Sequence, residues 1–388
     1  EKSTYYVTSK SDENRYIDEH IDVKDLTVLD PCMGSAHFLV YAFEVLMFIY
    51  QECGYAANDA AKSILENNLY GLDIDDRAFQ LAYFAVMMKA RQYNRRILNR
   101  DTVCHVYAIQ ESNSINRELL RYFGSGLSVL EKNDAETQMN ALLDLFTNAK
   151  EYGSIINVEA YNWELLRRYA SSIKQDAQIS IDSIGIEEVS KKLQTIIDIG
   201  WVLAKKYSVV ITNPPYLNKM DDELKQYVKR NYEAYSGDLF SVFIFRNFRF
   251  CQKDGYTGFM TPFVWMYIKS YEKLRKYIIQ EKGIATLIQM EYSAYEEATV
   301  PICAFILVNN TTQNVGRYFD LSKFVGGMEV QKEKVLEAIK NPDCGYYHEY
   351  RKSNFIRIKG HPIAFMASEK LLTIFETAEP LKQVAEPK

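Results

Sequence analysis

Short apolar runs that are typical of β-strands alternate with longer helical patterns along most of this chain of 388 residues. Repeated strand-helix-strand units fold into a doubly wound sheet that is covered by helices on both faces. We therefore predict an α/β fold with a mostly parallel, seven-stranded sheet. The last two strands are joined by a short loop and can pair antiparallel. The predicted strands are residues 26–29, 68–72, 103–109, 207–212, 256–260, 284–290 and 302–308.

Two regions do not follow this alternation of strand and helix patterns. Residues 112–205 carry long helical patterns and few strand signals, and we interpret them as a helical insertion between the third and fourth strands. We expect residues 1–111 and 206–312 to be the two halves of one α/β domain. Residues 313–388 are expected to be an extra segment and the start of a linker or a further region.

Hydropathy, cysteine spacing and net charge limit the cellular compartment and the partners that we expect for this protein. The longest apolar run, residues 38–50, is interrupted by Glu44 and is too short to span a bilayer, so we expect no membrane association. None of the six cysteines forms a CxxC pair, which argues against a zinc site or a disulfide framework and fits a reducing cytoplasm, and we expect no metal site. The net charge of −5 disfavours a nucleic-acid partner, unless the basic surface is local. The first residue is not Met, so we expect a fragment of a longer protein.

The strand predicted at 207–212 runs directly into Asn213, Pro214, Pro215 and Tyr216. Neither proline can donate a ladder hydrogen bond, so the strand stops and a stiff platform begins at its carboxyl end. Open α/β sheets place their ligands at this end of the strands. The platform offers a carboxamide, a carbonyl and an aromatic ring, a set that suits a planar heterocyclic amine.

A second candidate site follows the first two predicted strands. Residues 30–39 connect strand to helix through small residues, and the turn is expected to expose backbone N–H groups to an anionic group such as a carboxylate. Asp30 could receive an ammonium group. Asp73 ends the second strand, where a carboxylate can accept hydrogen bonds from a ribose diol, and Ile74 could pack on an adenine face. The loop is not GxGxxG, and by itself it is equally well explained as a plain strand-to-helix turn.

These stretches resemble the motifs of S-adenosylmethionine-dependent methyltransferases. The loop at 30–39 is similar to motif I, residues 71–75 to motif II, and residues 213–216 to motif IV of amino-methyltransferases, above all those acting on adenine N6 in DNA. The stretches at 70–91, 106–113 and 237–262 resemble the PglX family of adenine-specific methyltransferases from BREX phage-defence systems. The motif order resembles the γ class, and related patterns occur in type I and type IIG restriction-modification enzymes.

The resemblance implies a Rossmann-like class I methyltransferase fold and an enzyme that uses S-adenosyl-L-methionine. Its catalytic residues would be Asn213, Pro214, Pro215 and Tyr216, and Tyr216 would stack on a flipped adenine of double-stranded DNA. Tyr295 would hold the other face of the base, with Tyr292 as the alternative. Gln110 and Glu111, which follow the third predicted strand, are candidates for the edge of the cofactor adenine, although a polar strand end explains them equally well. The implied cofactor-binding residues are Asp30, Pro31, Cys32, Met33, Gly34, Ala36, Asp73, Ile74 and Gln110.

The resemblance also implies a role and its alternatives. The chain would mark host DNA as self within a BREX system, with other BREX proteins or phage-encoded inhibitors as partners, and residues 313–388 would begin a target-recognition region. Motif I of the family has a second glycine where this chain has Ala36, whose methyl is either tolerated or weakens cofactor binding. Two other functions stay open: a cofactor-binding, catalytically weak subunit of a defence complex, and an N-methyltransferase acting on protein glutamine or RNA.

Overall fold

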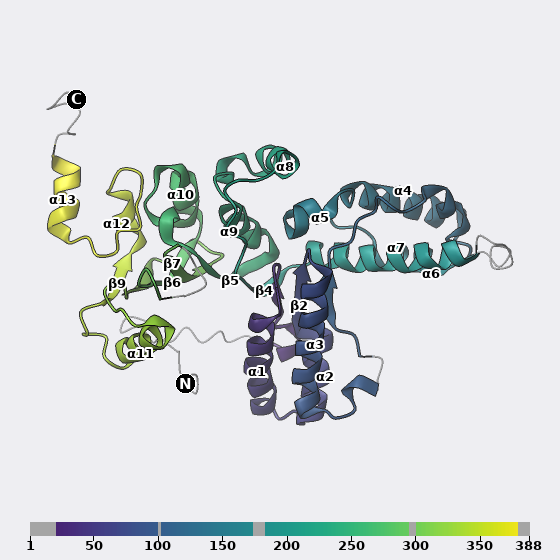
Figure 1. Ribbon diagram of the computed structural model, residues 1–388, viewed down its shortest axis with the longest axis horizontal. Helices are drawn as coiled ribbons and strands as arrows, with labels where there is room; N and C mark the ends of the chain where they lie inside the picture. The colour runs from purple at the N-terminus through teal and green to yellow at the C-terminus, as the bar shows by residue number, and fades with distance from the viewer. Residues whose placement is uncertain (1–20, 100–101, 174–182, 295–299, 379–388) are drawn as a thin grey trace. The chain divides into compact units, whose positions relative to one another are not determined.

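A computed structural model describes residues 21–99, 102–173, 183–294 and 300–378 of the chain. The described residues form two compact units, each discontinuous in sequence. The first unit contains residues 22–212 and 221–227, and the second contains residues 213–220 and 228–378. Helix α8 (Asp222–Tyr232) belongs in part to each (Figure 1).

The first unit is built on a parallel sheet whose order is β3-β2-β1-β4. Helices α1 and α3 pack on these strands, and their buried faces form one apolar core with the sheet. Because all four strands run in parallel, their carboxyl ends share one edge, where the loops of the first unit can build a site. The strands are β1 (Val28–Asp30), β2 (Leu69–Asp73), β3 (His105–Ala108) and β4 (Tyr207–Thr212). The helices that accompany them are α1 (His37–Glu52), α2 (Ala57–Ser63) and α3 (Asp76–Tyr93).

Between β3 and β4 the chain forms a helical layer. Helices α4, α6 and α7 lie side by side in Figure 1 and contact one another. Helix α4 begins with a capping box in which Ser128 and Glu131 satisfy each other's backbone N–H groups. The helices of this layer are α4 (Val129–Leu145), α5 (Ala149–Tyr152), α6 (Trp163–Ser171) and α7 (Ser183–Ala204). The short 3₁₀ turn η5 (Gly153–Ile155) follows α5 directly.

The second unit is built on a mixed sheet whose order is β5-β7-β6-β8-β9. Strand β7 pairs antiparallel with β5 and β6, β6 pairs parallel with β8, and β8 pairs antiparallel with β9. The strands are β5 (Cys251–Pro262), β6 (Gly283–Gln289), β7 (Ile302–Val308), β8 (Val315–Asp320) and β9 (Tyr347–Arg351). The helices are α9 (Leu239–Phe250), α10 (Glu272–Glu281), α11 (Gly327–Lys340), α12 (Lys352–Ile356) and α13 (Glu369–Thr377).

This architecture is α/β, as predicted, and each of the seven predicted strands is present. The antiparallel pairing of the last two, now β6 and β7, is confirmed. The expected seven-stranded, mostly parallel sheet is not confirmed. Two further strands, β8 and β9, extend the second unit. Among the described residues of that unit, three strand pairs are antiparallel, namely β5 with β7, β6 with β7 and β8 with β9, and only β6 with β8 is parallel.

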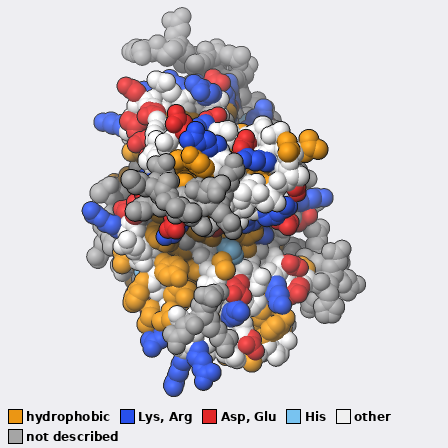
Figure 2. Space-filling model, turned by 90° about the vertical axis from the view of Figure 1, so that its right-hand side faces the viewer, with side chains coloured by type: hydrophobic (Ala, Val, Ile, Leu, Met, Phe, Trp, Pro, Cys, Tyr) orange, Lys and Arg blue, Asp and Glu red, His pale blue; other side chains and the backbone are white. Residues whose placement is uncertain are grey.

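Large hydrophobic side chains are exposed on α1 and α3 of the first unit. Figure 2 shows hydrophobic side chains gathered in the lower part of the view, the level of α1–α3 in Figure 1. Apolar surface of this kind commonly mediates protein–protein contacts. The exposed residues on these two helices are Tyr41, Val45, Phe48, Leu81, Tyr83 and Phe84.

Candidate functional site

Asp30 ends β1 as a buried carboxyl group with only 1% of its surface exposed. Its Oδ1 accepts hydrogen bonds from the Thr212 hydroxyl at 2.8 Å and from the Cys32 N–H at 3.1 Å. The structure gives no hydrogen-bond partner for its Oδ2. Burial, opposed by these two hydrogen bonds, raises the Asp30 pKa to about 7. A buried carboxyl with one unpaired oxygen is suited to receive a cationic donor.

The loop after β1 uses most of its own backbone N–H groups. Met33 donates to the Leu72 carbonyl at 3.0 Å, Gly34 donates to the Asp73 carboxylate at 2.9 Å, and Ala36 donates to the Met33 carbonyl at 2.7 Å. The prediction that this turn exposes its amides to an anion is therefore wrong for these three residues. The amides that lack an intrahelical acceptor are those in the first turn of α1, and α1 has no side-chain cap.

Ala36 precedes α1 in the left-handed region, with φ +68° and ψ +30°. This conformation explains why glycine is favourable here, since a Cβ is strained at positive φ. The Ala36 side chain is fully buried in the hydrophobic core of the first unit, together with Leu39 and Met33. Its methyl group therefore packs within the protein.

Asp73 and Ile74 stand at the carboxyl end of β2. The Asp73 carboxylate accepts from Gly34 through Oδ2 and from the Asp75 N–H through Oδ1 at 3.0 Å. Each carboxylate oxygen can accept two hydrogen bonds, so both keep capacity for a further donor. The Ile74 side chain is 51% exposed, which is unusual for isoleucine and leaves an apolar surface beside this carboxylate.

Gln110 and Glu111 follow β3 and are both engaged with neighbouring groups. The Gln110 amide donates to Asp76 Oδ1 and to the Ala108 carbonyl, both at 3.2 Å. Glu111 Oε1 accepts from the Lys150 backbone N–H at 3.3 Å. The structure therefore brings both candidates to the same edge of the sheet as Asp30 and Asp73.

The helical layer also reaches this edge, which the sequence did not suggest. The Ser154 hydroxyl donates to the Pro31 carbonyl at 2.6 Å, and both atoms are buried. Lys150 forms an ion pair with Asp76 at 2.6 Å. The available signal was the Gly153-Ser154 pair, because small residues permit such close approach.

Asn213, Pro214, Pro215 and Tyr216 belong to the second unit. Asn213 and Pro215 are exposed, Pro214 is buried, and Tyr216 is half-buried. The Tyr216 hydroxyl lies 2.8 Å from Asn213 Oδ1 and 3.0 Å from the Met260 carbonyl oxygen, and it can donate to either. The carboxamide and the ring of the predicted platform are thus held against each other.

Asp238 supports the segment that follows this platform and was not among the predicted site residues. Its Oδ1 accepts from the Leu217 N–H at 3.0 Å and from the Phe240 N–H at 3.2 Å. Burial raises its pKa, opposed by these backbone hydrogen bonds. An aspartate directly before an apolar helix is a known capping signal and could have identified it.

The remaining candidates are less constrained. Tyr295 lies outside the described residues, and its alternative Tyr292 is 64% exposed. Burial raises the pKa of the Cys32 thiol well above its usual value, which disfavours a reactive thiolate. Within the part of the chain that the structure describes, no three metal-ligating side chains cluster. No helix in that part is long and apolar enough to cross a bilayer.

Comparison with known proteins identifies relatives over most of the chain. Adenine-specific methyltransferase PglX of Lacticaseibacillus casei (strain Zhang) is 33% identical over 364 residues, covering 91% of this chain and 29% of that protein. Adenine-specific methyltransferase BrxX of Escherichia coli O9:H4 (strain HS) is 31% identical over 381 residues, covering 92% of this chain and 30% of that protein. The chain thus spans less than a third of the length of these relatives.

A solved structure and two family models agree with these relatives. A nuclease-deletion mutant of the Type ISP restriction-modification enzyme LlaGI, in complex with a DNA substrate mimic, matches 90% of this chain and 25% of its own with a TM-score of 0.50. Its 13% identity supports similarity of fold alone. The N-6 DNA Methylase model matches residues 12–113, and the Eco57I restriction-modification methylase model matches residues 67–295. These matches confirm the resemblance predicted from the motifs, and the chain belongs to the Eco57I restriction-modification methylase family.

Proposed function

We propose that this chain carries the catalytic part of a DNA methyltransferase that uses S-adenosyl-L-methionine to methylate adenine N6. The observation that carries the proposal is the unpaired, buried Oδ2 of Asp30. The loop that follows Asp30 leads into α1, which begins without a side-chain cap. A carboxyl acceptor suits the ammonium group of a methionine moiety, and the N-terminus of a helix suits its carboxylate. The names of the two relatives, both adenine-specific methyltransferases, support the same reaction.

The residues at the carboxyl edge of the first unit fit the rest of this cofactor. Asp73 keeps acceptor capacity for a ribose diol, and exposed Ile74 offers an apolar face for an adenine ring. Gln110 is proposed to face the edge of that ring. Pro31, Cys32, Met33, Gly34 and Ala36 form the turn that supports these groups. S-adenosylmethionine, when bound, supplies an electrophilic methyl group.

The platform residues are proposed to prepare the acceptor nitrogen. Adenine N6 is a weak nucleophile because its lone pair is delocalised into the ring. Asn213 Oδ1 and the Pro214 carbonyl oxygen accept hydrogen bonds from the two N–H groups of the adenine amino group. These bonds favour a pyramidal nitrogen and stabilise the positive charge that develops on it. Pro215 stiffens the turn, and alignment of the reacting groups supplies much of the acceleration.

The target base has to leave the duplex to reach these acceptors. Tyr216 is proposed to stack on one face of the flipped adenine and Tyr295 on the other. Double-stranded DNA is the proposed partner, and the match of residues 12–113 to the N-6 DNA Methylase model supports DNA as the substrate class. The net charge of −5 is compatible with this, provided that local basic helices contact the phosphates.

The biological setting is proposed from the relatives and from the motif resemblance. The chain would act in the cytoplasm within a BREX phage-defence system and mark host DNA as self, with other BREX proteins or phage-encoded inhibitors as partners. We further propose that residues 1–111 and 206–312 form the methyltransferase domain, that residues 112–205 are an insertion, and that residues 313–388 begin a target-recognition region or a linker.

The test is methyl transfer from tritiated S-adenosylmethionine to duplex DNA, RNA and protein substrates in parallel. Label in N6-methyladenine of DNA is expected, and label only in RNA or protein would refute the DNA assignment. Asn213→Ala is expected to abolish transfer with cofactor affinity unchanged, whereas Asn218→Ala, an exposed asparagine in the same segment, should retain activity. Asp73→Ala should weaken cofactor binding, and unchanged affinity by calorimetry would remove Asp73 from the site.

A further inference from the structure

A short segment of the helical layer, α5 with η5, contacts the loop that is proposed to hold the cofactor. The Ser154 hydroxyl donates to the Pro31 carbonyl at 2.6 Å, and Ser154 is only 2% exposed. Pro31 directly follows Asp30, so this bond fixes the start of the loop from outside its own sheet. The partners are 123 residues apart in sequence. Removal of the hydroxyl would leave a buried carbonyl without its donor.

The same segment approaches the end of β2. Gly153 has φ +58°, and a Cβ built at this position would lie 2.9 Å from Cγ2 of Ile74. Lys150 forms the ion pair with Asp76, and its backbone N–H donates to Glu111. One segment of seven residues, Ala149–Ile155, therefore contacts the loops that follow β1, β2 and β3.

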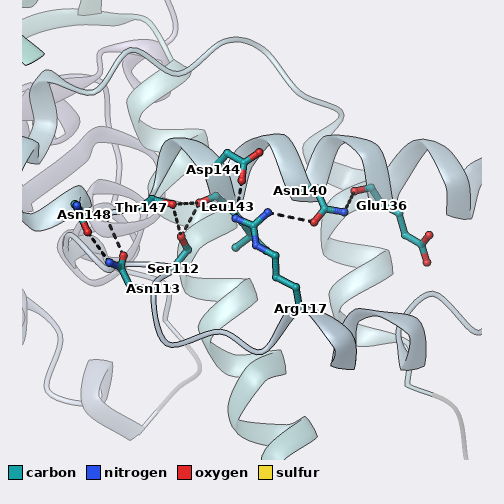
Figure 3. A network of polar contacts seen from close by, with 9 residues as sticks. All are labelled: Ser112, Asn113, Arg117, Glu136, Asn140, Leu143, Asp144, Thr147 and Asn148. Atoms are coloured by element: carbon teal, nitrogen blue, oxygen red, sulfur yellow. Dashed lines mark hydrogen bonds and ion pairs between the residues drawn. The ribbon is translucent and has the colours of Figure 1, made fainter.

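A polar network between α4 and the chain after β3 lies directly before this segment in the sequence. Figure 3 shows that Asn113 and Asn148 face each other, and they exchange hydrogen bonds of 2.5 and 2.9 Å. Ser112 donates to the Leu143 carbonyl at 2.5 Å, and Arg117 pairs with Asp144 at 2.6 Å. These contacts join the end of α4 and the residue that precedes α5 to the chain after β3.

We propose that the segment Ala149–Ile155 is a clasp that holds the cofactor loop in its binding conformation, with Ser154 as a positioning residue. This inference rests on the proposed function, because it assigns the loop to the cofactor. Ser154 acts through the loop, because its hydroxyl donates to the Pro31 carbonyl and its side chain also interacts with Cys32. The clasp thereby makes the helical layer part of the cofactor site.

The expected effect follows from the population of the competent loop. When only a fraction of molecules has the binding conformation, the apparent Kd rises by the inverse of that fraction. Loss of one ordinary buried hydrogen bond corresponds to a factor of about five to ten in such an equilibrium. Ser154→Ala should therefore weaken cofactor binding by up to about tenfold, the limit being reached when the competent loop is a minor state. At saturating cofactor kcat should be unchanged, because the loop is then held by its ligand.

The chain offers a matched control in Ser190, which is 8% exposed and donates to the Ala170 carbonyl at 2.9 Å. This bond is also buried, lies in the same helical layer and joins α7 to the end of α6. Ser190→Ala should lower thermal stability about as much as Ser154→Ala does. It should leave the cofactor affinity within about twofold, since its carbonyl partner is outside the proposed loop.

The experiment is calorimetric titration of wild type, Ser154→Ala and Ser190→Ala with S-adenosylhomocysteine, together with KM and kcat for methyl transfer. A rise in Kd and in KM for the cofactor, confined to Ser154→Ala, is the expected result. An unchanged Kd for Ser154→Ala, or an equal rise for Ser190→Ala, overturns the inference. If Ser154→Ala does not fold, Ser154→Cys takes its place, because cysteine is nearly isosteric with serine and is a weaker donor. Its Kd for the ligand should be higher than that of wild type. Failure of wild type to bind the ligand would instead refute the proposed function.

Discussion

Replacement of Asp30 by asparagine tests both the stability and the chemistry of the candidate site. In the native fold the Asp30 carboxyl is buried and one of its oxygens has no partner, so its ionised form is disfavoured. The carboxamide that replaces it would not be charged at any pH. Asp30→Asn is therefore expected to abolish cofactor binding. It is also expected to stabilise the ligand-free protein at alkaline pH, because a site suited to its ligand is often less stable without it.

The magnitude follows from the pKa. Burial raises the Asp30 pKa from 3.8 to about 7, so the native state binds a proton more tightly than the unfolded state. The stabilisation linked to this proton is complete below pH 3.8 and is lost as the pH rises through 7. At 1.36 kcal/mol per pKa unit it amounts to about 4 kcal/mol in total, of which about 2.5 kcal/mol is lost between about pH 5 and 8.

The assay is urea unfolding of wild type and Asp30→Asn at pH 5 and pH 8, followed by tryptophan fluorescence. Trp163 and Trp201 both lie in the first unit and report its unfolding. Other titrating groups are common to both proteins, so the difference between their unfolding free energies isolates Asp30. That difference should shift by about 2.5 kcal/mol in favour of Asp30→Asn as the pH rises. A pH-independent difference would refute the buried, uncompensated carboxyl.

Three further substitutions test other parts of the structure. Tyr216→Phe keeps the ring but removes the hydroxyl that contacts Asn213, so kcat should fall about tenfold with DNA affinity unchanged in steady-state and binding assays; a loss of DNA binding alone would contradict this. Gly71→Ala would place a Cβ 2.6 Å from Met33 Sδ, and the crowding should cost about 1–3 kcal/mol in thermal unfolding; an unaltered Tm would count against the close packing. Arg275→Met removes a buried guanidinium that donates to three carbonyl groups, and hydrogen exchange should increase locally around residue 360; an unchanged exchange pattern there would exclude this anchoring role.

The strand positions were predictable because the apolar runs are short, are rich in β-branched and aromatic residues, and are bounded by polar residues, which is typical of buried strands. Strands β8 and β9 were missed because charged residues interrupt them, and the residues of β9 are exposed or half-buried at the edge of the sheet. The antiparallel direction of β5 was also missed. Pairing direction depends on partners that lie far away in the sequence, such as β7, and no local pattern encodes it.

At the site, the sequence indicated which residue types gather at the strand ends but not which of them bond to one another. Asp73 was predicted as an acceptor, yet its contact with the Gly34 N–H depends on the fold of two separate loops. Thr212 was not considered as a site residue, although a polar side chain after the apolar residues Val209, Val210 and Ile211 was visible. The role of Ser154 required the path of the chain back from α4, which no spacing of motifs reveals.

The Tyr216 hydroxyl has one proton and two acceptors within reach, Asn213 Oδ1 and the Met260 carbonyl oxygen. If Asn213 is to accept a hydrogen bond from an adenine amino group, the Tyr216 hydroxyl can donate its proton to Met260 and so remains hydrogen-bonded. The exchange replaces one hydrogen bond by another of nearly equal length, so clearing the amide for its substrate costs little enthalpy. Without substrate, the Tyr216 hydroxyl can therefore occupy the acceptor atom of Asn213. When a base binds, the hydroxyl can leave that atom to the adenine amino group and keep a hydrogen bond to Met260.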